Sequence, residues 1–207
     1  MRQRCHPPAP PLAVRRPQLA AWSTLPAVLA ALLLGPLPAS AADWTWAGNH
    51  RLWLHPREGA PLALGSVSFS PTEGGRYRFA LALAPAPFKD FFLSMKEFKC
   101  AEGKDEIFCH VPYPYPQPGT VSAGDLAWLE HSLLFMFKTP RDFGAKLWNG
   151  VYFKLSLTAT GLEGSPQAID LNHISAPPDR PELPPYRPAL RDDIAPGARW
   201  FGRLSID

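Results

Sequence analysis

Hydrophobic and polar residues alternate along much of the chain after residue 43, which is the pattern of half-buried β-strands. The clearest pair of strands is 63–69 and 77–83, because Pro71-Thr72-Glu73-Gly74-Gly75 supplies turn chemistry between them. One apolar face and one polar face on each strand indicate an antiparallel sheet. We predict further strands at residues 44–46, 51–55, 92–98, 107–111, 151–160, 167–174 and 199–206, with a turn at 161–166.

One helix is predicted over residues 122–138. Ser122 is placed to cap it, and Asp125 stands three residues on, which is a weak form of the capping box. Leucines follow at helical spacing, and residues 133–137 are apolar on every side, so we expect the second half of the helix to be buried. Pro140 limits its extension.

About seven to eight short strands and one helix, without alternation of strand and helix, indicate an α+β, β-rich fold. We expect an antiparallel sheet, as a sandwich or a partly closed barrel, with the helix packed on it. The proline run at 112–118 cannot be a central strand, because proline lacks a ladder donor. A second proline-rich segment, 176–197, is expected to wrap the surface of a single domain covering 42–207.

The first 41 residues predict a cleavable secretory signal. Four arginines precede an apolar run over 19–37, and Ala39-Ser40-Ala41 follows as a small-residue cleavage site. Prolines interrupt the apolar run, and its unbroken core is shorter than the roughly 20 residues that span a bilayer. We therefore expect cleavage near Ala41, a periplasmic or secreted product, and no stable membrane anchor afterwards.

Removal of this segment changes the charge balance. The full chain has 21 Lys and Arg against 18 Asp and Glu. The predicted signal holds four of the arginines and no acidic residue, so residues 42–207 carry 17 basic and 18 acidic side chains. No basic stripe remains that would favour nucleic acid or an anionic membrane surface. We expect a protein or a small molecule as the partner.

Cys100 and Cys109 are the two cysteines that remain after the signal, which takes Cys5 with it. An isolated pair in an oxidising compartment has one connectivity, so we predict a disulfide. The polar loop 101–106 between two predicted strands makes this a hairpin stapled near its tip. The alternatives are redox chemistry, for which the spacing is not Cys-x-x-Cys, and a zinc site, which needs two further ligands.

No motif of known catalytic mechanism is present in the sequence. No two histidines have the local spacing of a metal motif, so we expect no metal site and no cofactor. Glu130 and His131 are adjacent on the predicted helix and diverge, so we interpret them as a solvated face rather than an acid–base pair. The sequence does not decide whether the protein is an enzyme, but the lack of a known catalytic motif favours a non-enzymatic role.

Tyr113 and Tyr115 stand between prolines and are expected to be partly exposed. A rigid strip loses little entropy when it binds, so these tyrosines and the nearby His110 are the candidate contacts for a partner. The alternative is a loop that only covers a sheet edge. The tryptophans after the signal are interpreted mainly as core residues.

Three stretches of the chain resemble uncharacterised exported proteins of Gram-negative bacteria: FLSMKEFKC at 92–100, CHVPYPY at 109–115 and ARWFGRLSI at 198–206. The resemblance covers most of 42–207 and implies no activity, cofactor or catalytic residue. The sequence thus predicts an exported, non-enzymatic binding or accessory protein. Two alternatives stay open. One is a lipocalin-like carrier of a small apolar ligand, which needs a closed barrel with an interior pocket. The other is a hydrolase with an unrecognised site.

Overall fold

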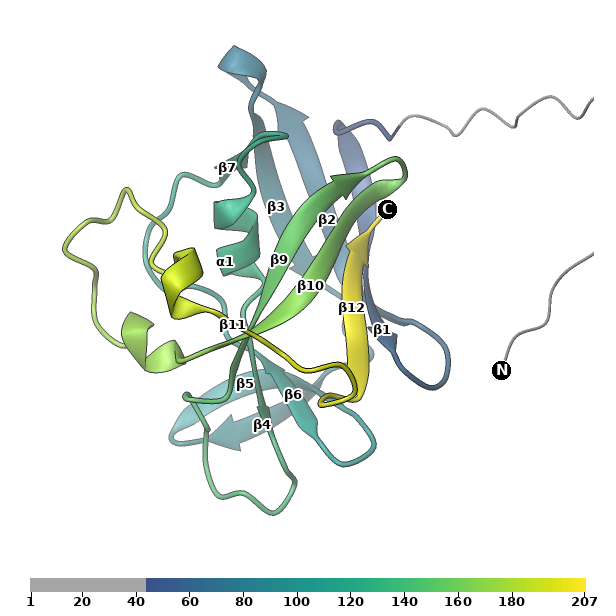
Figure 1. Ribbon diagram of the computed structural model, residues 1–207, viewed down its shortest axis with the longest axis vertical. Helices are drawn as coiled ribbons and strands as arrows, with labels where there is room; N and C mark the ends of the chain where they lie inside the picture. The colour runs from purple at the N-terminus through teal and green to yellow at the C-terminus, as the bar shows by residue number, and fades with distance from the viewer. Residues whose placement is uncertain (1–43) are drawn as a thin grey trace, which may run out of the picture. The chain divides into compact units, whose positions relative to one another are not determined.

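The computed structural model describes residues 44–207, so the predicted signal and its cleavage site near Ala41 lie outside the described residues. These residues form a β-rich fold with one antiparallel sheet and a single α-helix (Figure 1). The elements are β1 (Gly48–Pro56), β2 (Leu62–Pro71), β3 (Tyr77–Leu83), β4 (Lys89–Leu93), β5 (Lys96–Glu102), β6 (Ile107–His110), β7 (Thr120–Val121), α1 (Ala127–Ser132), β8 (Phe135–Lys138), β9 (Gly150–Thr158), β10 (Gly161–Ile169), β11 (Asp192–Asp193) and β12 (Phe201–Ile206).

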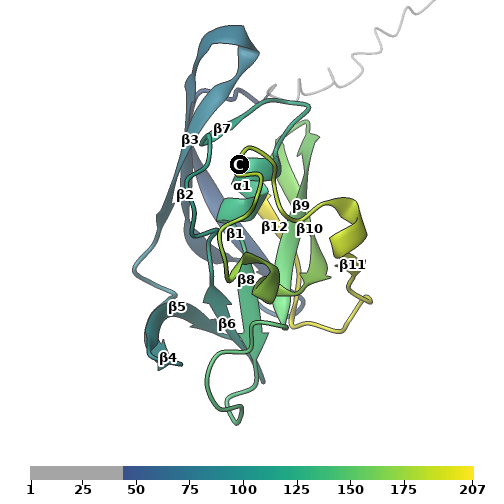
Figure 2. The same cartoon turned by 90° about the vertical axis from the view of Figure 1, so that its left-hand side faces the viewer.

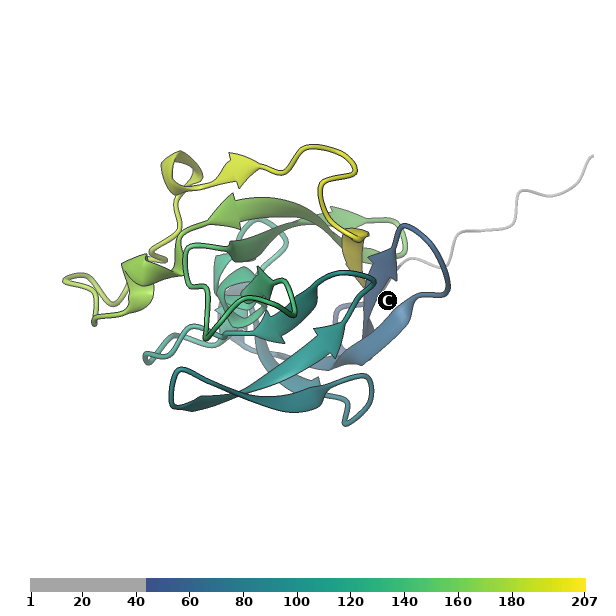
Figure 3. The ribbon, with the colours of Figure 1, turned by 90° about the horizontal axis from the view of Figure 1, so that it is seen from below.

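The sheet has 12 strands and is not closed, so the expected seven to eight strands were too few. Its order is β4-β5-β6-β8-β9-β10-β12-β1-β2-β3-β7, and β11 pairs with β10 beside this path. The sheet curls so that β2 and β3 lie opposite β9 and β10, with α1 between them (Figures 1 and 2). Seen from below, the first and the last strand, β1 and β12, lie side by side (Figure 3).

Apolar side chains fill the concave side of the sheet. Leu54, Phe153 and Leu204 reach it from three strands, and Leu129 reaches it from α1. A second apolar cluster lies on the other face of β6, β8 and β9, where Tyr186 from the proline-rich segment covers it. β6, β8 and the first half of β9 are therefore buried on both faces, which is why these stretches are apolar without clear alternation, whereas the second half of β9 has exposed polar side chains.

The helix is shorter than predicted. It covers Ala127–Ser132, while Phe135–Lys138 forms β8, between β6 and β9, so the prediction of a helix over 122–138 is wrong. Successive side chains of β8 enter the two apolar clusters in turn, and a strand buried on both faces has the same composition as a buried helix. Asp125 does stand at the helix start, where its carboxylate accepts the N–H of Ala127 at 3.3 Å.

The predicted strand 92–98 is two strands. Ser94 and Met95 form the turn between β4 and β5, and both have positive φ angles, 50° and 64°. The predicted hairpin and its disulfide are present, but β5 extends to Glu102, so the loop covers 103–106 rather than 101–106. Cys100 and Cys109 lie opposite each other on β5 and β6 and form a disulfide with an S–S distance of 2.06 Å.

The predicted turn at 161–166 lies within β10, and the chain reverses instead at residues 159–160. Gly164 is closely surrounded there; a Cβ would lie 3.1 Å from side-chain atoms of Leu155 and Phe153, which is a tight contact. Residues 171–174 form a 3-10 helix rather than a strand, and 44–46 precede β1.

Candidate functional site

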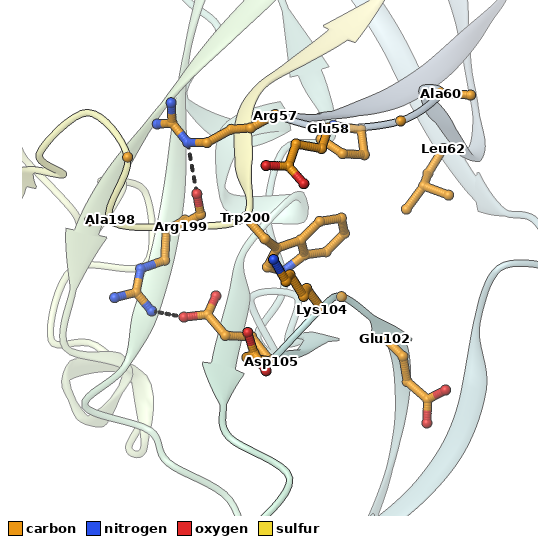
Figure 4. Close-up of a pocket in the computed structure, with 15 residues that line it drawn as sticks. Arg57, Glu58, Ala60, Leu62, Glu102, Lys104, Asp105, Ala198, Arg199 and Trp200 are labelled. Carbon is orange, nitrogen blue, oxygen red and sulfur yellow. Dashed lines mark hydrogen bonds and ion pairs between the residues drawn. The ribbon is translucent and has the colours of Figure 1, made fainter.

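A cavity of about 570 Å³ opens where three distant segments meet (Figure 4). They are the connection between β1 and β2 at 57–61, the tip of the disulfide hairpin at 102–106, and residues 197–200 before β12. We call it the hairpin-tip cavity. Its volume is in the range of sites for small ligands. The disulfide lies on the strands that carry the hairpin tip and restricts how far this wall can move.

Trp200 and Leu62 are the largest apolar residues that line the cavity. Trp200 is anchored by edge-to-face contacts with Phe201 and Phe108, at centroid distances of 5.6 and 6.4 Å. Gly103 packs against its indole so closely that a Cβ on Gly103 would lie 2.6 Å from ring atoms. The hairpin tip therefore requires glycine at this position for a steric reason.

A partly buried ion pair forms one wall. The guanidinium of Arg199 donates to Glu106 Oε1 and lies 3.8 Å from the centroid of the Phe137 ring, so it is held by charge and by a cation–π contact. Burial raises the pKa of Glu106, and the nearby Arg199 opposes this shift without cancelling it. Arg57 Nε donates to the backbone oxygen of Arg199 at 2.8 Å and joins the first segment to this wall.

Five exposed charged residues line the cavity: Arg57, Glu58, Glu102, Lys104 and Asp105 (Figure 4). Glu102 forms an ion pair with Lys89, and the other four form no ion pair within residues 44–207. The rim thus offers two cations and two carboxylates without an ion-pair partner beside an indole.

Two buried polar atoms of the wall lack a hydrogen-bond partner within the described residues, Trp200 Nε1 and Glu106 Oε2. An unsatisfied buried polar group costs about 1–3 kcal/mol. Protein atoms cover both, so a ligand reaches them only if the hairpin tip moves.

The tyrosines predicted from the sequence lie elsewhere. Tyr113 is only 6% exposed, so the expectation that it is partly exposed is wrong; its ring packs against Trp128 and His131. Tyr115 is half-buried, 5.5 Å from Tyr113 between ring centroids, and lines an apolar groove of about 360 Å³. His110 instead packs on Phe135, in the inner cluster.

His110 is held by the protein itself. Its Nε2 hydrogen-bonds the backbone oxygen of Ser132 at 2.8 Å, and burial lowers its pKa. The structure therefore brings the two tyrosines together and leaves His110 apart from them. Their role in binding a partner stays a prediction.

The interpretation of Glu130 and His131 as a solvated face is wrong, because both are buried. Glu130 accepts from the hydroxyl of Tyr152 and, at 2.7 Å, from the N–H of Leu155. His131 Nδ1 lies 2.7 Å from the backbone oxygen of Ala127, and its Nε2 accepts the N–H of Tyr186 at 3.1 Å. Each ring or carboxylate atom thus has a structural partner, which fixes α1 between β9 and the proline-rich segment.

Sequence reasoning missed a second cluster, on the outer face of β1 and β12. His55 Nε2 lies 2.9 Å from Ser205 Oγ, and Trp53 Nε1 donates to Asp207 Oδ1 at 2.9 Å. Burial lowers the pKa of His55, with a further contribution from nearby Arg203. His55 and Ser205 are 150 residues apart, so only the pairing of β1 with β12 brings them together.

Comparisons with protein-family models, with curated proteins and with solved structures find no match. The resemblance to exported bacterial proteins accordingly stays a prediction. Within residues 44–207, no three His, Cys, Asp or Glu side chains are grouped so as to hold a metal ion. None of the helices in this part of the chain has the length and apolarity needed to cross a membrane.

Proposed function

We propose that this chain is an exported binding protein without a catalytic role, and that its hairpin-tip cavity binds a small zwitterionic ligand. The observation that carries this proposal is the rim, where Arg57, Lys104, Glu58 and Asp105 present both charges around one indole-lined cavity. A ligand with an ammonium and a carboxylate group, such as an amino acid or a short peptide, would engage both signs at once. Charged hydrogen bonds of this kind are among the stronger ones.

Isothermal titration calorimetry with free amino acids and dipeptides, each compared with its N-acetylated and amidated form, tests the proposal. We expect binding of free forms and loss of binding when both ends are capped. Replacement of both rim cations, Arg57→Gln with Lys104→Gln, should weaken binding roughly tenfold or more, because each charged hydrogen bond contributes about 1.5–3 kcal/mol.

The matched control removes two exposed cations away from the cavity, Arg180→Gln with Arg187→Gln, and should leave the dissociation constant unchanged. Equal affinity for free and capped ligands, or no binding of any of them, would rule out a zwitterionic ligand.

A carrier of an apolar ligand finds less support. It requires a closed sheet around an interior pocket. The sheet is open, and side chains fill its concave side.

A hydrolase remains the second candidate, because His55 and Ser205 form the histidine–hydroxyl pair that nucleophilic catalysis requires. A fluorophosphonate probe tests it: Ser205 Oγ would attack phosphorus, fluoride would leave, and His55 would take the hydroxyl proton. This candidate predicts labelling of Ser205 that His55→Ala abolishes, whereas the binding protein proposed above would stay unlabelled. An unlabelled wild-type protein would exclude this candidate.

A further inference from the structure

Two loops at one end of the sheet expose large apolar side chains that pack on nothing. Met95, in the turn between β4 and β5, is 90% exposed, and Phe143, between β8 and β9, is 96% exposed. The loops contact each other, since Ser94 Oγ accepts the N–H of Ala145 at 3.0 Å. Trp148 adds a third exposed side chain from the second loop, which forms the lower end of the view in Figure 1.

The backbone at Met95 makes its exposure notable. Its φ of 64° lies in the left-handed region, where glycine and asparagine are favoured and other residues are uncommon. Polar turn residues would suit this hairpin better. Observed backbone strain of this kind is a reason to look for function. Here the strained turn exposes the apolar side chain of Met95 to solvent.

Cations are interspersed with these apolar residues. Lys96, Arg141 and Lys146 lie within segments 94–96 and 141–148, and Lys146 Nζ is 5.1 Å from the centroid of the Trp148 ring. The one acid in these segments is Asp142, whose carboxylate accepts the N–H of Thr139 at 2.8 Å. The two loops therefore carry a net positive charge, although residues 42–207 together are nearly neutral. This local charge differs from the sequence prediction of no basic stripe, because the loops are far apart in the sequence and meet only in the fold.

We propose that these two loops form a surface that docks on an anionic phospholipid bilayer. The residues of this loop surface are Met95, Phe143 and Trp148 with Lys96, Arg141 and Lys146. Protruding side chains suit the interfacial region of a bilayer, whereas a protein partner would better fit a groove. Apolar insertion together with lysine and arginine is how peripheral proteins hold an anionic membrane, and tryptophan favours the same interface. The surface is separate from the hairpin-tip cavity and does not depend on its ligand.

Co-sedimentation with vesicles tests the proposal. Two compositions are compared, phosphatidylcholine alone and phosphatidylcholine with one third phosphatidylglycerol. We expect binding to the anionic vesicles at about 0.1 M salt and much weaker binding at about 1 M, where the screening length falls to about 3 Å. The variant Met95→Ser with Phe143→Ser should bind the anionic vesicles roughly tenfold more weakly.

The matched control replaces two exposed leucines elsewhere, Leu183→Ser with Leu190→Ser, and should change binding less than about twofold, because neither lies in the loop surface. Any contribution of an uncleaved leader is common to all variants, and circular dichroism confirms that each is folded. Absence of binding to anionic vesicles, or equal binding of the Met95→Ser/Phe143→Ser variant and the wild type, would overturn the proposal.

Discussion

At the scale of single residues, burial decides the protonation of His131. Its ring lacks solvent exposure, and burial lowers its pKa to about 4. The hydrogen bonds to Ala127 and Tyr186 require one protonated and one bare ring nitrogen, so the folded domain needs the neutral form. A second proton would disrupt the contact that attaches the proline-rich segment to α1.

We therefore expect acid to destabilise the domain through His131. In the unfolded chain the ring takes up its proton near pH 6.5, and in the folded domain near pH 4. Between these values the unfolded state binds more protons, so the contribution is complete above pH 6.5 and is lost as the pH falls towards 4. A shift of this size corresponds to about 3 kcal/mol, measurable by urea unfolding across this range.

His131→Gln serves as the comparison, because it cannot titrate. Its free energy of unfolding should depend less on pH than that of the wild type, although it will be lower at neutral pH. Burial raises the pKa of Glu130, which gives a pH dependence of the opposite sign, but this is common to both proteins. Identical slopes for the two proteins would show that His131 is not the responsible group.

At the scale of elements, the disulfide hairpin of β5 and β6 supplies one of the three segments that line the hairpin-tip cavity. Its disulfide closes a short loop and stabilises the folded state by about 2–3 kcal/mol in the chain-entropy account. The loop it closes carries Gly103, which lies against the indole of Trp200. The disulfide and the contact with Trp200 thus both restrain the loop at the tip of this hairpin.

The substitution Gly103→Ala should destabilise the domain by about 1–3 kcal/mol, because the new methyl group would overlap the Trp200 ring. The urea midpoint and the tryptophan fluorescence spectrum, to which Trp200 contributes, should both change. Gly202→Ala in β12 is the control, since a Cβ there meets nothing within 4 Å. If the two variants unfold alike, the contact between Gly103 and Trp200 does not constrain the hairpin tip.

Elements could be predicted from the sequence where the signals for them lie within a few residues of one another. The hairpin of 63–69 with 77–83 and the cysteine pair were visible because turn chemistry and alternation lie within a few residues. Residues 133–137 were misassigned because an unbroken apolar run has no period, and only pairing with β6 and β9 makes part of it a strand.

The hairpin-tip cavity was not predictable in the same way. Arg57, Lys104 and Trp200 come from three segments, and each is ordinary in its own stretch of sequence. The signal that could have been used was indirect: a polar loop between two cysteines is held in place, and therefore suits a binding wall. The segments that face this loop across the cavity are brought there by the strand order, which the alternation of hydrophobic and polar residues does not encode.

At the scale of the whole domain, the strand order places the two ends of the described chain together. β12 lies between β10 and β1, where Ile206 is opposite both Leu162 and Leu52. The inner apolar cluster takes side chains from β1 and β12 alike. β12 therefore joins two halves of the sheet. One half has the order β4-β5-β6-β8-β9-β10, the other has the order β1-β2-β3-β7, and without β12 no strand connects them.

This strand order has a consequence for the timing of folding. During synthesis β1 becomes available early, whereas β12, which pairs with one edge of β1, becomes available only after the other strands. Pairings between distant parts of a sequence also form slowly. The sheet of residues 44–207 therefore cannot be completed until β12 is available to pair with β1 and β10.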